Sequence, residues 1–83
     1  MDVKVLGTGC AKCKLLFAEA QKAVTTAGLP ASLAKVEQID EIMKFGVMMT
    51  PALVVDGEVK CAGRIPQATE IVTWLMNAAA RHG

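Results

Sequence analysis

The first half of the chain alternates short apolar runs with a long segment of helical periodicity. Residues 3–6 form an apolar-rich run that predicts a strand, which Gly7 ends. Between residues 11 and 27 the apolar side chains recur at steps of three and four. This spacing predicts an amphipathic helix with one apolar stripe, made of Leu16, Phe17, Ala20, Val24 and Ala27. Residues 31–36 are a candidate second strand, and residues 38–45 fit a short helix.

The second half predicts a β-hairpin followed by a helix. Residues 52–55 and 58–62 are rich in β-prone side chains, and Asp56-Gly57 between them favours a tight turn because both turn positions take positive φ. Pro66 suits the first turn of a last helix that extends to residue 80, with an apolar face of Ile71, Val72, Leu75 and Ala79. The predicted order is βαβαββα, an α/β fold in a single domain of residues 1–83.

Composition and charge narrow the possible functions. The 83 residues are 53% hydrophobic and carry a net charge of +1, so we expect neither disorder nor a nucleic-acid partner. The longest uncharged stretch, residues 23–34, is shorter than the roughly 20 residues of a membrane-spanning helix, and no signal peptide is apparent. Three cysteines do not suggest a secreted disulfide scaffold. We therefore expect a cytoplasmic monomer without a membrane partner, whose cysteines serve chemistry.

Two of the cysteines, Cys10 and Cys13, form a CxxC motif where the first loop becomes the first helix. Cys13 lies three residues before Leu16 and continues the apolar stripe, whereas Cys10 precedes the helix and is expected to stay accessible. One helical turn brings the two sulfurs within disulfide reach. An accessible attacking thiol and a sheltered resolving thiol are what thiol–disulfide exchange requires.

The position of the motif also predicts its acidity. The N-terminus of a helix stabilises an anion by about 0.3–1 kcal/mol at the surface and by up to about 2 kcal/mol when partly buried. Lys12 adds a neighbouring positive charge. We therefore predict that the pKa of Cys10 is lowered and that the pKa of Cys13 is not.

The CxxC motif has three interpretations. Redox exchange is favoured because CxxC in a cytosolic βαβ context is typical of thioredoxin-like proteins. Metal binding is the alternative, although two thiolates are fewer than the four ligands of a closed zinc site. In the third interpretation both cysteines are inert, which does not fit an accessible Cys10.

The chain resembles the thioredoxin fold in its minimal, glutaredoxin-sized form, and most closely the short prokaryotic redox-active disulfide proteins. The resemblance is carried by residues 9–13, by residues 46–57 with Thr50-Pro51 before the hairpin, and by residues 62–66. It implies a four-stranded mixed sheet flanked by three helices, with the first strand central, parallel to the second and antiparallel to the third. Lys4 stands where thioredoxins carry a buried acid, and the chain has no tyrosine of the glutaredoxin type.

The resemblance also implies a mechanism. Cys10 would be the nucleophile and Cys13 the resolving thiol, with their disulfide as the redox centre and no other cofactor. Pro51 would be cis and abut the cysteine pair, the Thr50 backbone would bind an extended substrate segment, and Gly63 would complete the groove. The implied partners are a disulfide-bearing protein substrate and an upstream reductase, either of the thioredoxin-reductase type or the glutathione system.

A second class of function is a copper-, mercury- or zinc-binding module that uses the CxxC thiolates. Residues 7–13 are similar to the GMxCxxC loop of heavy-metal-associated domains, but those domains end in a strand, whereas this chain is predicted to end in a helix.

Three further residue types have competing interpretations. Cys61 is expected to pack in the core on the same face as Val59, a redox, metal or intermolecular role being the alternative. Met48 and Met49 either form an apolar lip beside the substrate groove or fill gaps in the core. Trp74 is expected in the core rather than as a cofactor platform.

Overall fold

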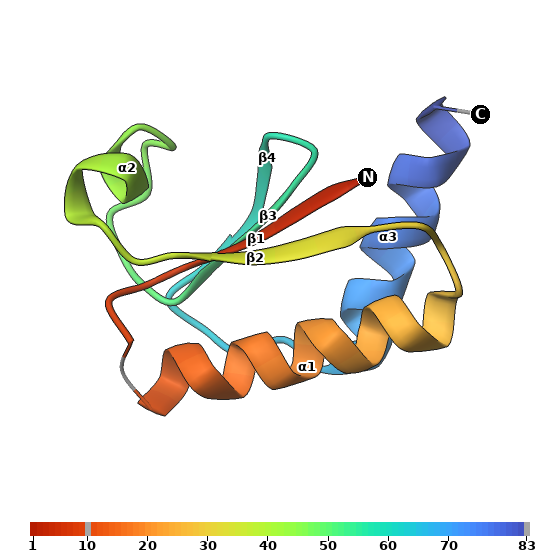
Figure 1. Cartoon of the computed structure of the whole chain (residues 1–83), viewed down its shortest axis with the longest axis horizontal. Coiled ribbons are helices and arrows are strands. Elements are labelled where there is room, and N and C mark those ends of the chain that lie inside the picture. Colours follow the sequence, from red (N-terminus) through yellow and green to blue (C-terminus); the bar gives the residue numbers. More distant parts are fainter. Residues whose placement is uncertain (10, 83) are drawn as a thin grey trace.

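The computed structural model describes residues 1–9 and 11–82, without the side chain of residue 82 (Figure 1). Its elements follow the predicted βαβαββα order: β1 (Asp2–Leu6), α1 (Ala11–Ala27), β2 (Ser32–Val36), α2 (Ile39–Met43), β3 (Ala52–Val55), β4 (Glu58–Ala62) and α3 (Ala68–His82). The candidate second strand is thus confirmed. The last helix begins at Ala68, two residues after Pro66, and α2 is shorter than predicted. Residues 56 and 57 both take positive φ, as the hairpin turn requires.

The strands form one mixed sheet in the order β2-β1-β3-β4. β1 is parallel to β2 and antiparallel to β3, and β3 is antiparallel to β4. In Figure 1, α1 and α3 lie on one side of the sheet and α2 lies at the opposite side. This arrangement confirms the minimal α/β thioredoxin fold with a four-stranded sheet and, in the described residues, three helices.

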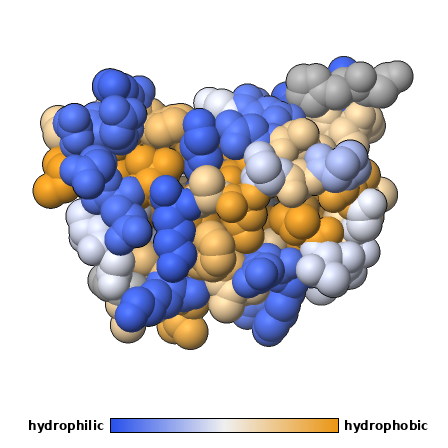
Figure 2. All heavy atoms as spheres, in the orientation of Figure 1, coloured by the Kyte–Doolittle hydropathy of each residue, from blue (hydrophilic) through white to orange (hydrophobic). Residues whose placement is uncertain are grey.

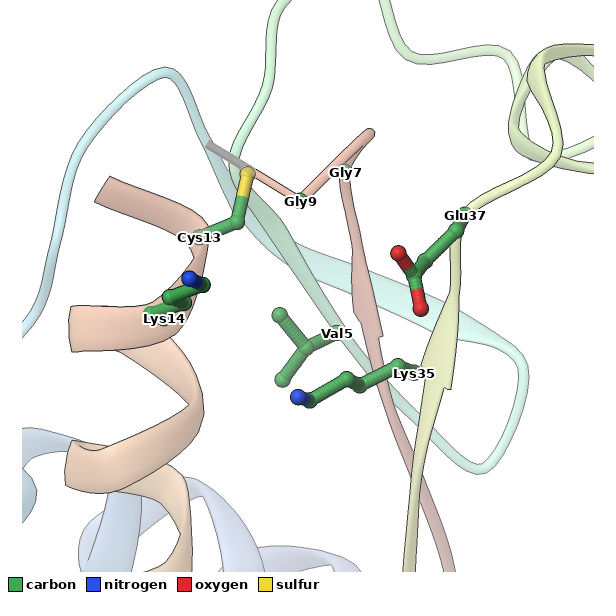
Figure 3. Close-up of a pocket in the computed structure, with 7 residues that line it drawn as sticks. All are labelled: Val5, Gly7, Gly9, Cys13, Lys14, Lys35 and Glu37. Atoms are coloured by element: carbon green, nitrogen blue, oxygen red, sulfur yellow. The ribbon is translucent and has the colours of Figure 1, made fainter. Parts of the chain in front are cut away.

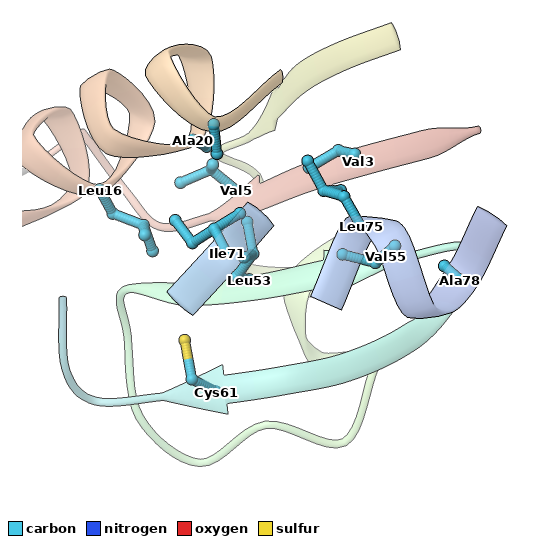
Figure 4. Close-up of a cluster of buried hydrophobic side chains, with 11 residues drawn as sticks. Val3, Val5, Leu16, Ala20, Leu53, Val55, Cys61, Ile71, Leu75 and Ala78 are labelled. Atoms are coloured by element: carbon cyan, nitrogen blue, oxygen red, sulfur yellow. The ribbon is translucent and has the colours of Figure 1, made fainter. Parts of the chain in front are cut away.

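Alternation along the strands divides the apolar side chains between the two faces. Val3 and Val5 of β1 contribute to the larger cluster, which also contains residues of α1, α3, β3 and β4 (Figure 4). Leu6 contributes to a smaller cluster beneath α2, together with Ile42, Ala52 and Val54. The same alternation puts Lys4 on the α2 face, where its ammonium pairs with Asp2 (Nζ–Oδ2 3.2 Å) and lies 5.6 Å from the Phe45 ring centroid.

The helices are rotated slightly from the predicted apolar stripes. The buried residues of α1 are Cys13, Leu16, Ala20 and Ala23, whereas Phe17, Val24 and Ala27 lie half-buried at the rim. In α3 the fully buried residues are Ile71, Leu75 and Ala78, and Ala79 is only partly covered. The reason is that α1 also packs against α3, so each helix turns its small alanines toward a neighbour. Trp74 packs at the edge of the larger cluster rather than inside it.

A β-bulge corrects the prediction for Cys61. Leu53 pairs with Cys61, but the next residue, Val54, pairs with Val59, so Lys60 is the extra residue of β4. Val59 therefore packs against the smaller cluster, while Cys61 points into the larger one (Figure 4). The prediction that Cys61 and Val59 share a face was wrong because a bulge interrupts the two-residue period. The prediction that Cys61 packs in the core is confirmed.

Across the residues that the structure describes, no helix is both long enough and apolar enough to cross a membrane.

Candidate active site

Cys13 lies in the first turn of α1 and is buried, with 6% of its surface exposed. Its predicted place on the apolar stripe is confirmed. In Figure 3 the sulfur points toward the loop that carries Gly7 and Gly9. Cys10 lies outside the described residues, so its exposure and its distance from Cys13 remain predictions from the sequence.

Gly7 makes the position of the Cys13 sulfur possible. A Cβ atom at residue 7 would lie 2.2 Å from the Cys13 Sγ and 3.1 Å from its Cβ. The backbone of Gly7 is held in place, since its N–H donates a hydrogen bond to the Val36 carbonyl at 2.9 Å. The sulfur thus rests directly on the backbone at the end of β1. The sequence did not indicate this contact of Gly7 with Cys13, because it joins residues brought together by the tertiary fold.

The Thr50–Pro51 step also lies near the side of Gly7 that Cys13 contacts. The Thr50 Cβ is 4.0 Å from the position that a Gly7 Cβ would take, and the Thr50–Pro51 peptide bond is cis. Pro51 is buried and Thr50 is exposed. The structure therefore brings Cys13 and Thr50–Pro51, which are far apart in the sequence, to the same glycine.

Gly63 is joined to this loop by a hydrogen bond. Its N–H donates to the Pro51 carbonyl at 2.8 Å, and its φ of 81° is one that side chains rarely adopt. A Cβ at residue 63 would lie 2.9 Å from Cε of Met49 and 3.2 Å from its Cβ. The side chain of Met49 thus lies directly against the backbone of Gly63. The Arg64 guanidinium, next in sequence, is held by the Glu70 carboxylate at 3.2 and 2.7 Å.

Met48 and Met49 are 95% and 61% exposed, so the interpretation that they fill the core was wrong. They precede Thr50 on a loop without regular helix or strand. Ile39 and Met43 of α2 are also exposed. Figure 2 shows hydrophobic surface around the α2 end of the molecule.

A cavity of about 120 Å³ opens beside Cys13, between α1 and the ends of β1 and β2 (Figure 3). Its charged wall consists of Lys14 from α1, Lys35 from β2 and Glu37, which directly follows β2. The Glu37 Oε2 lies 3.2 Å from where a Cβ of Gly9 would be. Sequence analysis missed Lys35 and Glu37, because only the parallel pairing of Val5 with Lys35 brings them to the cysteine motif.

Cys61 has the surroundings of an unreactive thiol. It is 8% exposed in the larger cluster, and burial raises its pKa above the usual 9.0, while a backbone hydrogen bond with Leu53 acts in the opposite direction. A neutral buried thiol reacts slowly, because the thiolate is the nucleophile. The described contacts of Cys61 are those of a core residue.

The raised pKa of Cys61 predicts a pH dependence of stability. Above pH 9.0 the thiol ionises in the unfolded chain but stays neutral in the folded chain, so its contribution is complete below that pH and is lost as pH rises toward the folded pKa. We expect the free energy of unfolding of wild type to exceed that of Cys61→Ala by an amount that shrinks over the alkaline range above pH 9.0. Urea unfolding of both proteins across this range measures the difference. A constant difference would contradict the prediction.

A CxxC sequence whose second cysteine, Cys13, lies in the first turn of α1 near a cis-proline loop on a mixed four-stranded sheet is typical of the class of thioredoxin-fold thiol–disulfide oxidoreductases. Residues 1–76 match the model of the thioredoxin domain. A thioredoxin of Methanothermobacter thermautotrophicus is 39% identical over 71 residues, which cover 86% of this chain and 92% of that protein. A thioredoxin of Methanocaldococcus jannaschii is 35% identical over 69 residues, 83% of this chain and 79% of its own length. The chain belongs to the thioredoxin family.

Membership of this family supports oxidoreductase activity, with disulfide substrates and reductase partners in general. The metal-binding alternative finds no support in these comparisons. Among the described side chains, those of residues 1–9 and 11–81, no three His, Cys, Asp or Glu are grouped so that they can hold a metal ion.

Proposed function

We propose that the protein reduces disulfides of other proteins through the dithiol of Cys10 and Cys13. The observation that carries this proposal is the Cys13 sulfur, sheltered in the first turn of α1 against Gly7 and next to the Thr50–Pro51 step. A sheltered sulfur one helical turn after a second cysteine matches the resolving position of thiol–disulfide exchange.

The reaction consists of two exchanges. The Cys10 thiolate, its pKa lowered by the start of α1 and by Lys12, attacks one sulfur of the substrate disulfide, and the other substrate sulfur leaves as a thiolate that takes up a proton. Cys13 then gives up its proton and attacks the Cys10 sulfur of the mixed disulfide. The second substrate thiolate leaves, and the Cys10–Cys13 disulfide forms. Two electrons pass from the protein to the substrate.

The substrate segment binds across the loop that contains Thr50 and Pro51. Thr50 is exposed, and its backbone offers the hydrogen bonds of an added strand. Gly63 holds this loop in place, because its N–H donates a hydrogen bond to the Pro51 carbonyl. Met48 and Met49 form an adaptable apolar lip along the same loop.

The oxidised protein is returned to the dithiol by an upstream reductase of the thioredoxin-reductase type or by the glutathione system. The reaction needs no cofactor other than the cysteine pair. A reducing compartment favours this direction of electron flow, so we place the protein in the cytoplasm, acting as a monomer.

A reductase assay tests the proposal. Wild type, Cys10→Ser, Cys13→Ser and the control Cys61→Ser are compared on a disulfide-bonded peptide, with dithiothreitol as the reductant. We expect turnover to be abolished in the first two variants and retained in Cys61→Ser, because the described contacts of Cys61 are those of a core residue in the larger cluster. Turnover by Cys10→Ser would refute the mechanism. A protein that holds one Cu(I) or Hg(II) tightly and reduces no disulfide would favour the metal-binding alternative.

A further inference from the structure

The lysines and arginines of the described residues fall into two groups. Six of the nine pair with a carboxylate within 4.0 Å: Lys4, Lys22, Lys44, Lys60, Arg64 and Arg81. The described residues provide no such carboxylate for the other three, Lys12, Lys14 and Lys35. We call these three lysines the basic rim. Lys35 also lies over the Phe17 ring, with its Nζ 4.7 Å from the ring centroid, a contact that leaves its positive charge without a neutralising carboxylate. A surface charge without a carboxylate partner keeps more of its field than a paired one, so among the described residues the basic rim is a source of positive potential.

The basic rim lies around Cys13. Lys12 and Lys14 lie in the first turn of α1 on either side of Cys13, and all three lysines are exposed. Lys35 comes from β2, on the opposite wall of the cavity that Lys14 and Cys13 line (Figure 3). Glu37 is the acidic residue of that wall, so the cavity residues carry two positive charges and one negative charge.

Helix stability does not account for this placement. The positive end of the helix dipole favours acidic side chains in the first turn and disfavours lysines there. α2 follows this rule with Asp40 and Glu41, and α3 follows it with Glu70. α1 has no acidic residue in its first turn and carries two lysines instead. A local rule broken beside a reactive site points to a role in function.

We propose that the basic rim selects disulfides flanked by acidic residues. This inference rests on the proposed function and specifies its substrate class, an acidic protein segment. Positive charges around the attacking thiol raise the local concentration of an acidic partner and orient it before the first exchange. The apolar lip at Met48 and Met49 then binds the extended segment, while the rim holds its acidic flank.

Two disulfide-bonded peptides of identical length test the inference, one with glutamates and the other with lysines next to each cysteine. At an ionic strength of about 0.02 M we expect wild type to reduce the acidic peptide with a kcat/KM about tenfold higher than the basic one. The double variant Lys14→Gln/Lys35→Gln should lower this ratio to about twofold, and about 0.5 M salt should do the same in wild type. Lys12 is kept, since it lies between the cysteines and affects the thiolate directly.

The matched control is Lys22→Gln/Lys44→Gln, which changes the net charge equally at lysines already paired with Glu19 and Glu41. This variant should keep the tenfold ratio. Equal rates for the two peptides in wild type, or equal losses in the two double variants, would overturn the inference.

A binding measurement separates this inference from the proposed function. Versions of the peptides with serine in place of cysteine are titrated into the protein while the amide signals of α1 are followed by NMR. Tighter binding of the acidic serine peptide, together with no turnover of the disulfide peptides, would support recognition of acidic segments by the basic rim and would refute the proposed reductase function. A single-stranded oligonucleotide that binds more tightly than the acidic peptide would reassign the rim to nucleic acid.

Discussion

A Cys13→Ser variant incubated with a disulfide substrate is expected to accumulate a covalent mixed disulfide, and a Cys10→Ser variant is not. In Cys13→Ser the attacking thiol survives, but the resolving thiol that would release the substrate is missing. In Cys10→Ser the remaining thiol at residue 13 is only 6% exposed and rests on Gly7, so a protein disulfide cannot reach it in line for attack. Each variant lacks one sulfur of the wild type, and we expect the yield of adduct to be about a hundredfold higher for Cys13→Ser than for Cys10→Ser.

Non-reducing electrophoresis and mass spectrometry of the intact adduct measure this difference. Both variants are made in a Cys61→Ala background, so that any adduct is assigned to a single cysteine. The adduct of Cys13→Ser should disappear on addition of dithiothreitol. Trapping by Cys10→Ser instead would invert the roles of the two cysteines.

Gly7→Ala is expected to destabilise the protein by about 2–3 kcal/mol, the cost of forcing a methyl group into a packed interior. The new Cβ would lie 2.2 Å from the Cys13 sulfur, and the hydrogen bond from the Gly7 N–H to Val36 prevents the strand from moving away. The sulfur must therefore shift, which also moves the resolving thiol from its position. We expect disulfide turnover to fall by about tenfold or more, since small displacements of reacting groups have large effects on rate.

A double-mutant cycle identifies the contact. In a Cys13→Ala background the sulfur is absent, so Gly7→Ala should cost about 1 kcal/mol or less, although the Cβ of residue 13 stays close. Gly28→Ala is the control, because nothing lies within 4 Å of the new methyl group and its φ of 65° causes strain that does not depend on residue 13. Chemical unfolding of the reduced proteins gives the four free energies. Equal costs of Gly7→Ala in both backgrounds would show that the contact with Cys13 is not the cause.

Most of the secondary structure was predictable, because each element has a local signal. The three- and four-residue steps of α1, the Asp56-Gly57 turn and the stop at Gly28 depend only on residues close in sequence. The predictions of side-chain orientation were wrong where packing against residues distant in the sequence determines which face a side chain takes. Because α1 is rotated toward α3, Ala23 is in the core instead of the predicted Phe17. Because of the bulge opposite Leu53, Val59 lies on the other face of the sheet from Cys61.

The candidate site divides in the same way. Cys13 and the Thr50-Pro51 step were found from motifs, and the burial of Cys13 followed from its spacing to Leu16. Lys35 and Glu37 carry no motif, and no motif indicated the contact of Gly7 with Cys13; these became visible only when β1 paired with β2 and α1 packed across them.

The amino-acid sequence by itself determined which segments form helices, which form strands and that Cys13 faces inward, because backbone preferences and hydrophobic periodicity act over a few neighbouring residues. Only the tertiary structure decided that one glycine makes room for the inner sulfur, and that unpaired lysines from two separate elements gather around it. The physical reason is that contact distances and ion pairs depend on strand register and helix rotation. Both are set by the packing of the whole chain rather than by any local stretch.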